Sequence, residues 1–140
     1  MARLGDPDPV TFTEEVRDDL ELPGRSREMV ILAVAVYTDC SFELARHEPT
    51  ARANGVEDRV QQLIRARWID SPELADQDRT LLRFTVEVLR SPTVSDKLFD
   101  AVREILSERE IVEVLQVIGY YWTYGRIITV LDVQLTDVYG

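Results

Sequence analysis

The sequence predicts an all-α protein with a single domain of six or seven helices. Apolar residues recur at helical spacing along most of the chain, and capping residues, prolines and glycines separate these segments. No segment shows the alternation of a strand, and 140 residues suffice for one hydrophobic core. We therefore expect one domain over residues 1–140, with a core over about 20–135 and a proline-containing N-terminal arm over 1–10.

Two helices are expected in the N-terminal part of the chain. Thr11–Glu14 has the spacing of a capping box, which predicts a short helix over about 13–20, ended by Pro23 and Gly24. Ser26 can cap a second helix over Ser26–Tyr37, whose interior is apolar on all sides. Its valines would also suit a buried strand, but the helical surroundings and the lack of a partner strand favour a helix at the centre of the core.

A reversal and a third helix follow. Thr38–Ser41 contains three good capping residues in four positions, so one helix should end and another begin there. The new helix should run to Ala53 and end at Asn54-Gly55, because these residues readily adopt the left-handed conformation. Pro49 lies inside it and is expected to kink it or to split off a short piece near residue 48.

The sequence pattern predicts four more helical segments in the C-terminal part of the chain. Apolar spacing indicates a helix over 56–67, and Ser71-Pro72 suggests a cap for a helix over about 72–90. Another helix is expected over about 96–106. Ser107–Glu110 is a capping box before the longest helix, over about 108–123, which Gly125 can interrupt before it resumes to about 135. The last helix carries more apolar and aromatic surface than a small bundle can cover, which suggests a subunit interface.

Composition limits the possible partners and locations. The chain has 16 basic and 26 acidic residues, a net charge of −10, which disfavours nucleic acid and anionic membranes and favours a small-molecule substrate or another subunit. The single cysteine excludes an intrachain disulfide. The longest apolar run is half of a membrane span, and the N-terminus lacks a secretory signal, so we expect a cytoplasmic protein.

The only cysteine and the only histidine lie seven residues apart, around Glu43. At about 100° per residue, Cys40, Glu43 and His47 fall within roughly 60° of one another on a helix. If the chain reverses at residues 38–41, Glu28 comes back within reach of His47. We therefore expect one pocket that contains Glu28, Cys40, Glu43 and His47.

These groups favour acid–base chemistry over thiol chemistry. Two carboxylates next to an imidazole suit proton transfer near neutral pH. A helix N-terminus would lower the pKa of the Cys40 thiol, but Glu43 one turn away acts in the opposite direction. The alternatives are a surface helix pair for His47 and a core packing role for Cys40, and the tyrosines of the last helix are interpreted as core and interface residues. No metal-binding motif supports a metal site, and no cofactor is expected.

Three segments carry a resemblance to a known family. They are Ser26-Arg27-Glu28 with the apolar helix, Phe42–Val56, and Leu106–Tyr121. Together they resemble the carboxymuconolactone decarboxylase family, which includes the alkylhydroperoxidase D-like proteins. The resemblance implies an all-α fold and a homo-oligomer, a trimer or a hexamer. It also implies that Glu28, Cys40 and His47 correspond to the relay acid, the first cysteine and the histidine of the peroxidase branch, whereas Glu43 replaces its second cysteine.

This replacement indicates the non-peroxidatic branch, because dithiol turnover needs a second thiol. The resemblance then implies decarboxylation of a small cyclic carboxylic acid or lactone, with the His/Glu pair handling protons. We assign this acid–base work to His47 with Glu43 and Glu28. Because the protein is net negative, a local positive group must attract the anionic substrate, and Arg46 is the nearest candidate in the sequence. One alternative is a peroxidase with peroxiredoxin activity, or a redox sensor, that uses Cys40 and an external thiol. Another is a non-catalytic oligomer in which the site is only packing.

Overall fold

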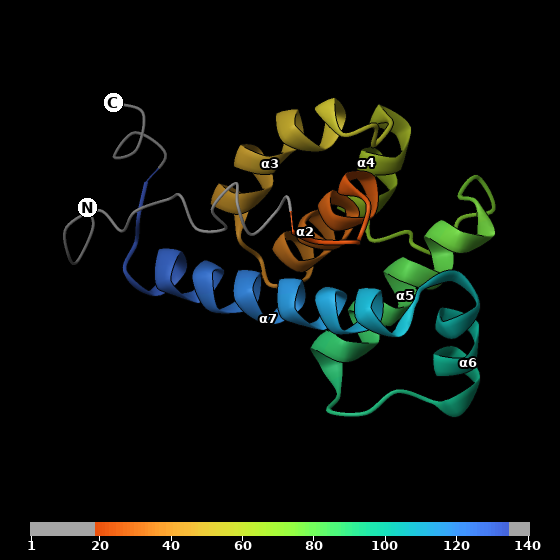
Figure 1. The fold of residues 1–140 in the computed structure, drawn as a ribbon. Coiled ribbons are helices and arrows are strands. Elements are labelled where there is room, and N and C mark those ends of the chain that lie inside the picture. The colour runs from red at the N-terminus through yellow and green to blue at the C-terminus, as the bar shows by residue number, and fades with distance from the viewer. Residues whose placement is uncertain (1–18, 135–140) are drawn as a thin grey trace.

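The structure, a computed structural model, describes residues 19–134. All regular secondary structure in this part of the chain is helical. Its helices, shown in Figure 1, are α2 (Gly24–Tyr37), α3 (Ser41–Ala53), α4 (Asp58–Arg65), α5 (Asp76–Arg90), α6 (Asp96–Ile105) and α7 (Glu108–Val130). The all-α fold class is thus confirmed. The predicted arm over 1–10 and nearly all of the helix predicted over 13–20 lie outside the described residues.

Helix α2 is the centre of the bundle. It packs against α3, α4, α5 and α7, and every residue from Glu28 to Val36 is buried. A helix with neighbours on all sides has no solvent-facing stripe, which explains why the sequence of α2 is apolar all round. Burial of each of its larger apolar side chains contributes about 1.5–3 kcal/mol. The prediction of a central buried helix is confirmed.

The turn between α2 and α3 brings the two helices back alongside each other. Asp39 adopts the left-handed conformation (φ 56°), and the N–H of Cys40 donates to the carbonyl of Ala35 at 2.8 Å. With the weaker bond from Asp39 N–H to Val36 O, this is a Schellman ending of α2. The reversal is where it was predicted. The α3 N-cap, Cys40, makes no side-chain capping bond, and the turn is closed by these backbone hydrogen bonds and by the Thr38 hydroxyl, which donates to the carbonyl of Val34 at 2.6 Å.

Two helices begin at other residues than predicted. Helix α2 begins at Gly24 and not at Ser26, because Pro23 has the extended conformation of an N-cap (ψ 146°) and ends the preceding segment. Helix α5 begins at Asp76 and not near 72. Ser71 and the residues after it form a turn, in which Ser71 Oγ accepts the N–H of Glu73 and Leu74 is buried. Two hydrogen bonds from the Arg79 guanidinium to the carbonyls of Ser71 and Leu74 hold this turn in place.

Neither Pro49 nor Gly125 interrupts its helix. Helix α3 is continuous through Pro49, and both Pro49 and Ala45, whose carbonyl loses its usual partner, are exposed, so water can take the place of the missing N–H. Helix α7 continues through Gly125 to Val130. A Cβ at Gly125 would lie 3.6 Å from Cys40, an ordinary van der Waals contact, so the end of α7 packs directly against the α2–α3 turn.

Helix α7 also fixes the segment that enters α2. Its capping box is formed as predicted, with Ser107 and Glu110 exchanging side-chain-to-backbone hydrogen bonds of 2.9 and 3.1 Å. One turn further, the buried Glu113 carboxylate accepts the backbone N–H groups of Glu21 and Leu22 at 2.9 and 3.0 Å. The start of α2, and with it Glu28, is therefore tied to α7.

One face of α7 carries large apolar side chains that are exposed. Their exposed fractions lie between 38% and 56%, and the residues are Val112, Leu115, Trp122, Ile127 and Val130. Over residues 19–134, no helix is both long and apolar enough to cross a membrane.

Candidate functional site

Helices α2 and α3 bring Glu28, Glu43 and His47 into direct contact. The Nδ1 atom of His47 lies 3.0 Å from Oε1 of Glu28, and its Nε2 atom lies 3.2 Å from Oε2 of Glu43. The side chains of Glu28 and Glu43 are 1% and 3% exposed, and that of His47 is 12% exposed. A largely buried imidazole thus lies between two buried carboxylates.

The two carboxylates differ in how they are satisfied. Glu28 is hydrogen-bonded through both oxygens, to His47 and to Arg27. Glu43 is within ion-pair distance of His47, but in an orientation that is not that of a hydrogen bond, and neither of its oxygens has a hydrogen-bond donor among the described residues. A buried carboxylate without a donor is costly. Glu43 is therefore the group of this site best suited to accept a hydrogen bond from a ligand.

The environment raises the pKa of His47 above its usual value of 6.5. Burial of the ring lowers the pKa, but the hydrogen bond to Glu28, the close approach of Glu43 and the charges of both carboxylates together outweigh this effect. The protonated imidazole is therefore favoured near neutral pH, where it can act as a general acid.

This raised pKa predicts a pH-dependent stability. The protonated form of His47 stabilises the folded protein, fully below the unfolded pKa of about 6.5, and this stabilisation is lost as the pH rises through the higher folded pKa. We expect the free energy of unfolding to fall from pH 6 to 8, by up to about 1.4 kcal/mol for each unit by which the folded pKa exceeds the unfolded one. Urea unfolding of the wild type and of His47→Gln measures it, and an equal fall in both would contradict the assignment.

Helix α7 covers the His47 ring with an aromatic side chain. The buried Tyr121 ring meets the imidazole edge-on, with a centroid distance of 5.2 Å and an interplanar angle of 87°. Tyr120 contacts Tyr121 in the same way and stacks on Tyr124. The sequence interpretation of these tyrosines as core residues holds for Tyr121 and Tyr124, which are buried, but it missed that Tyr121 forms part of the site.

The structure places Cys40 at the start of α3, in a different environment from His47. It is 2% exposed and packs in a small apolar cluster with Phe42, Tyr124, Ile128 and Val133. Burial raises the pKa of its thiol above 9.0. The backbone N–H groups at the start of α3 and Arg126 act in the opposite direction, while Glu43 adds to the rise. The thiol form is therefore favoured, which suits a packed cysteine better than a nucleophile.

A low reactivity of Cys40 follows from this burial. We expect Ellman's reagent to label the native protein far more slowly than the same chain in denaturant, because both access and thiolate formation are suppressed. Labelling followed at pH 7.5 with and without guanidinium measures the ratio. Native labelling at the rate of a free cysteine would contradict the packed state.

Arg46, the predicted substrate-binding residue, lies next to His47 on α3. Its Nη1 atom is buried and has no hydrogen-bond partner among the described residues. An arginine nitrogen that is desolvated without an acceptor is suited to bind a carboxylate oxygen. No described contact joins Arg46 to His47, so its place in the site is not fixed by the geometry of the three central residues.

Sequence reasoning missed Arg27, which donates from Nε to Oε2 of Glu28 at 3.2 Å. Its Nη2 atom also donates to Oδ1 of Asn54, at the end of α3. Adjacent residues on a helix point about 100° apart, so the sequence gives no sign that Arg27 bends back to the carboxylate beside it.

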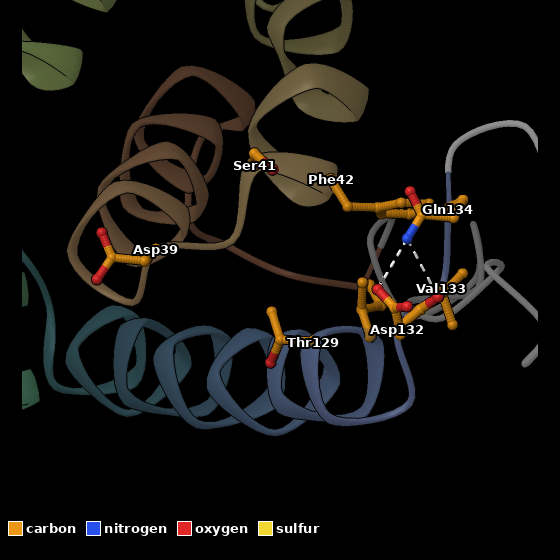
Figure 2. Close-up of a pocket in the computed structure, with 8 residues that line it drawn as sticks. Asp39, Ser41, Phe42, Thr129, Asp132, Val133 and Gln134 are labelled. Atoms are coloured by element: carbon orange, nitrogen blue, oxygen red, sulfur yellow. Dashed lines mark hydrogen bonds between the residues drawn. The ribbon is translucent and has the colours of Figure 1, made fainter. Parts of the chain in front are cut away.

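Two cavities adjoin the turn between α2 and α3. One, of about 360 Å³, is lined by residues from the start of α3 and the end of α7, among them Asp39, Phe42 and Asp132 (Figure 2). The other, of about 390 Å³, is bordered by Leu44, Arg65 and Arg67. His47 lines neither.

Within residues 19–134, no group of three or more histidine, cysteine, aspartate or glutamate side chains is arranged to hold a metal ion.

Comparison with protein families gives one match. A model of the carboxymuconolactone decarboxylase family matches residues 9–87, more than half of the chain. This segment contains α2 and α3 and therefore all three residues of the central contact. No curated protein sequence matches the chain significantly.

Two solved structures share the fold. A protein of unknown function from Agrobacterium tumefaciens, provisionally assigned as the antioxidant defence protein AhpD, superposes with a TM-score of 0.80 at 22% identity, over 96% of this chain and 97% of that one. An uncharacterised peroxidase-related protein from Silicibacter superposes with a TM-score of 0.73 at 18% identity, over 83% of this chain and 61% of that one. At these identities the likeness shows the AhpD-like helical fold.

Proposed function

The chain belongs to the carboxymuconolactone decarboxylase family, and we propose from this that it is a cofactor-independent enzyme that decarboxylates a small cyclic carboxylic acid or lactone. The observation that carries the proposal is the contact of His47 with two buried carboxylates, Glu28 and Glu43. It supplies a proton donor with a raised pKa.

The proposed reaction uses the proton on Nε2 of His47, the nitrogen that lies 3.2 Å from Oε2 of Glu43. When the carbon–carbon bond to the carboxylate breaks, carbon dioxide leaves and the electron pair stays on the ring carbon, delocalised toward the lactone carbonyl. That carbon then takes a proton from the His47–Glu43 pair, which solvent reprotonates. Glu28 accepts a hydrogen bond from Nδ1–H, so the proton is exchanged at Nε2, the nitrogen that faces Glu43.

Arg46 is proposed to bind the substrate carboxylate. A protein of net charge −10 repels anions at long range, so a local cation is needed to hold one. The buried Nη1 atom of Arg46 without an acceptor supports this role.

The test is a direct assay of the purified protein with carboxymuconolactone, in which carbon dioxide release and the loss of ring absorbance are measured. Turnover without added metal or cofactor supports the proposal. Parallel assays with hydrogen peroxide and an organic hydroperoxide, each with an external thiol, address the peroxidase alternative through Cys40. Peroxide turnover without decarboxylation would overturn the proposal, and inactivity in all assays with a panel of related lactones would favour a non-catalytic oligomer.

We also propose that the protein is a homo-oligomer, a trimer or a hexamer, located in the cytoplasm. The exposed apolar side chains of α7 support the first part, because large apolar surfaces of this kind often mark interaction sites between proteins. The single, unpaired cysteine supports the second. Sedimentation equilibrium of the wild type and of a Trp122→Glu variant tests the oligomer: dissociation is expected only in the variant, and a monomeric wild type would overturn it.

A further inference from the structure

The carboxylate of Glu28 is divided between two cations. Oε1 faces Nδ1 of His47 at 3.0 Å, and Oε2 accepts a hydrogen bond from Nε of Arg27 at 3.2 Å. The side chain of Arg27 is 11% exposed, so both contacts lie in a largely dry environment. There a charge-assisted hydrogen bond is strong, and its loss is costly.

Arg27 is itself held by the end of α3. Its Nη2 atom donates to Oδ1 of Asn54 at 3.4 Å, and the Asn54 amide donates to the carbonyl of Thr50 at 2.8 Å. Asn54 is the C-cap of the helix that carries His47. One guanidinium thus joins the start of the Glu28 helix to the end of the His47 helix.

The close approach at this junction requires a glycine. A Cβ atom at Gly24 would lie 2.2 Å from Oδ1 of Asn54 and 3.5 Å from Nη2 of Arg27. A contact of 2.2 Å is far inside van der Waals distance, so any other residue would push Asn54 away from Arg27. Since Gly24 has no positive φ, the glycine serves the close approach and not an unusual backbone conformation.

We propose that Arg27 is a positioning residue of this site, which turns Glu28 toward His47 and competes with the imidazole for the carboxylate's charge. The inference rests on the proposed function in so far as His47 is the proton donor. By holding Oε2, Arg27 fixes the orientation of Glu28 and leaves a single oxygen for Nδ1 of His47. The orientation of the imidazole is therefore fixed, but only part of the negative charge of Glu28 stabilises its protonated form. His47 can therefore release its proton to a substrate.

The charged and titratable groups around His47 come from each helix packed on it. Glu28 lies on α2, Glu43 on α3, and the Tyr121 ring on α7. Arg27 has no described contact with the imidazole and acts through Glu28. If Arg27 is removed, Glu28 keeps one cation partner, so the pair formed by Glu28 and His47 should hold its proton to higher pH.

The chain offers a direct test, because His47 is its only histidine. Its imidazole signals in an NMR pH titration need no assignment. We expect Arg27→Gln to raise the pKa of His47 by about one unit, a typical effect of one nearby charge. Arg27→Lys, which retains the charge, is expected to stay close to the wild type. Arg59→Gln, which removes an exposed arginine paired with Glu73, is the matched control and should leave the pKa unchanged.

A second variant keeps the test decisive if Arg27→Gln does not fold. Asn54→Ala releases the other end of the guanidinium, so it should raise the pKa of His47 in the same direction by a smaller amount. A pKa of His47 that is unchanged or lower in every folded variant of this set would overturn the proposal and leave Arg27 a purely structural role. The titration uses no substrate, so the two proposals can fail separately. If the protein has no decarboxylase activity but Arg27→Gln still raises the pKa of His47, the proposed function is refuted and the positioning role of Arg27 is retained.

Discussion

Replacing His47 by glutamine is expected to lower kcat for decarboxylation by about 100-fold or more, the usual contribution of a general acid. Glutamine can keep a hydrogen bond to Glu28 but cannot deliver a proton. Because the substrate carboxylate is assigned to Arg46 and not to His47, KM should change much less than kcat. Initial rates of carbon dioxide release over a range of substrate concentrations separate the two parameters.

The matched control for this variant is Glu48→Gln, at the next position of α3. Glu48 pairs with Arg65 at the surface, and it has no described contact with His47. Its kcat should stay within about twofold of the wild type, since exposed pairs contribute little. A His47→Gln protein that folds and retains full activity would remove His47 from the mechanism, and the proposed function would then need another proton donor.

The sequence was informative where one local pattern had one physical explanation. A run of nine apolar residues cannot face water, so the central place of α2 followed from the sequence alone. The reversal after Tyr37 followed from turn-forming residues, and the contact between Glu28 and His47 followed from the reversal and the rise of a helix. Both the fold class and the central pair of the candidate site were thus predictable.

The remaining features depend on contacts between segments far apart in the sequence. Helical spacing places Cys40 and His47 on the same face of a helix. In the structure Cys40 is the N-cap of α3 and is buried against the end of α7, which the spacing could not indicate. The start of α5 is set by bonds from Arg79 to the preceding turn, which outweigh the local signal of Ser71-Pro72. The bond between Arg27 and Glu28 likewise depends on Asn54, 27 residues away.

Replacing Glu28 by alanine is expected to lower the free energy of unfolding by about 3–5 kcal/mol, the usual cost of breaking a buried ion pair. Glu28 is 1% exposed and is the shared partner of Arg27 and His47. Its removal leaves a buried guanidinium and a buried imidazole without their acceptor, and it also leaves a cavity beside α3. Urea unfolding at pH 6 measures the loss.

Two comparisons separate the charge of Glu28 from its volume. Glu28→Gln keeps the shape of the side chain and one acceptor oxygen, so its loss of unfolding free energy should be about half that of Glu28→Ala. Glu57→Ala removes an exposed carboxylate paired with Arg25 and should cost only about 0–1 kcal/mol. The loss in Glu28→Ala should also be smaller at pH 9 than at pH 6, because the wild type then no longer gains from a protonated His47. An equal loss at both pH values would mean that Glu28 is needed only by Arg27, and that the imidazole and the carboxylate do not share a proton-dependent bond.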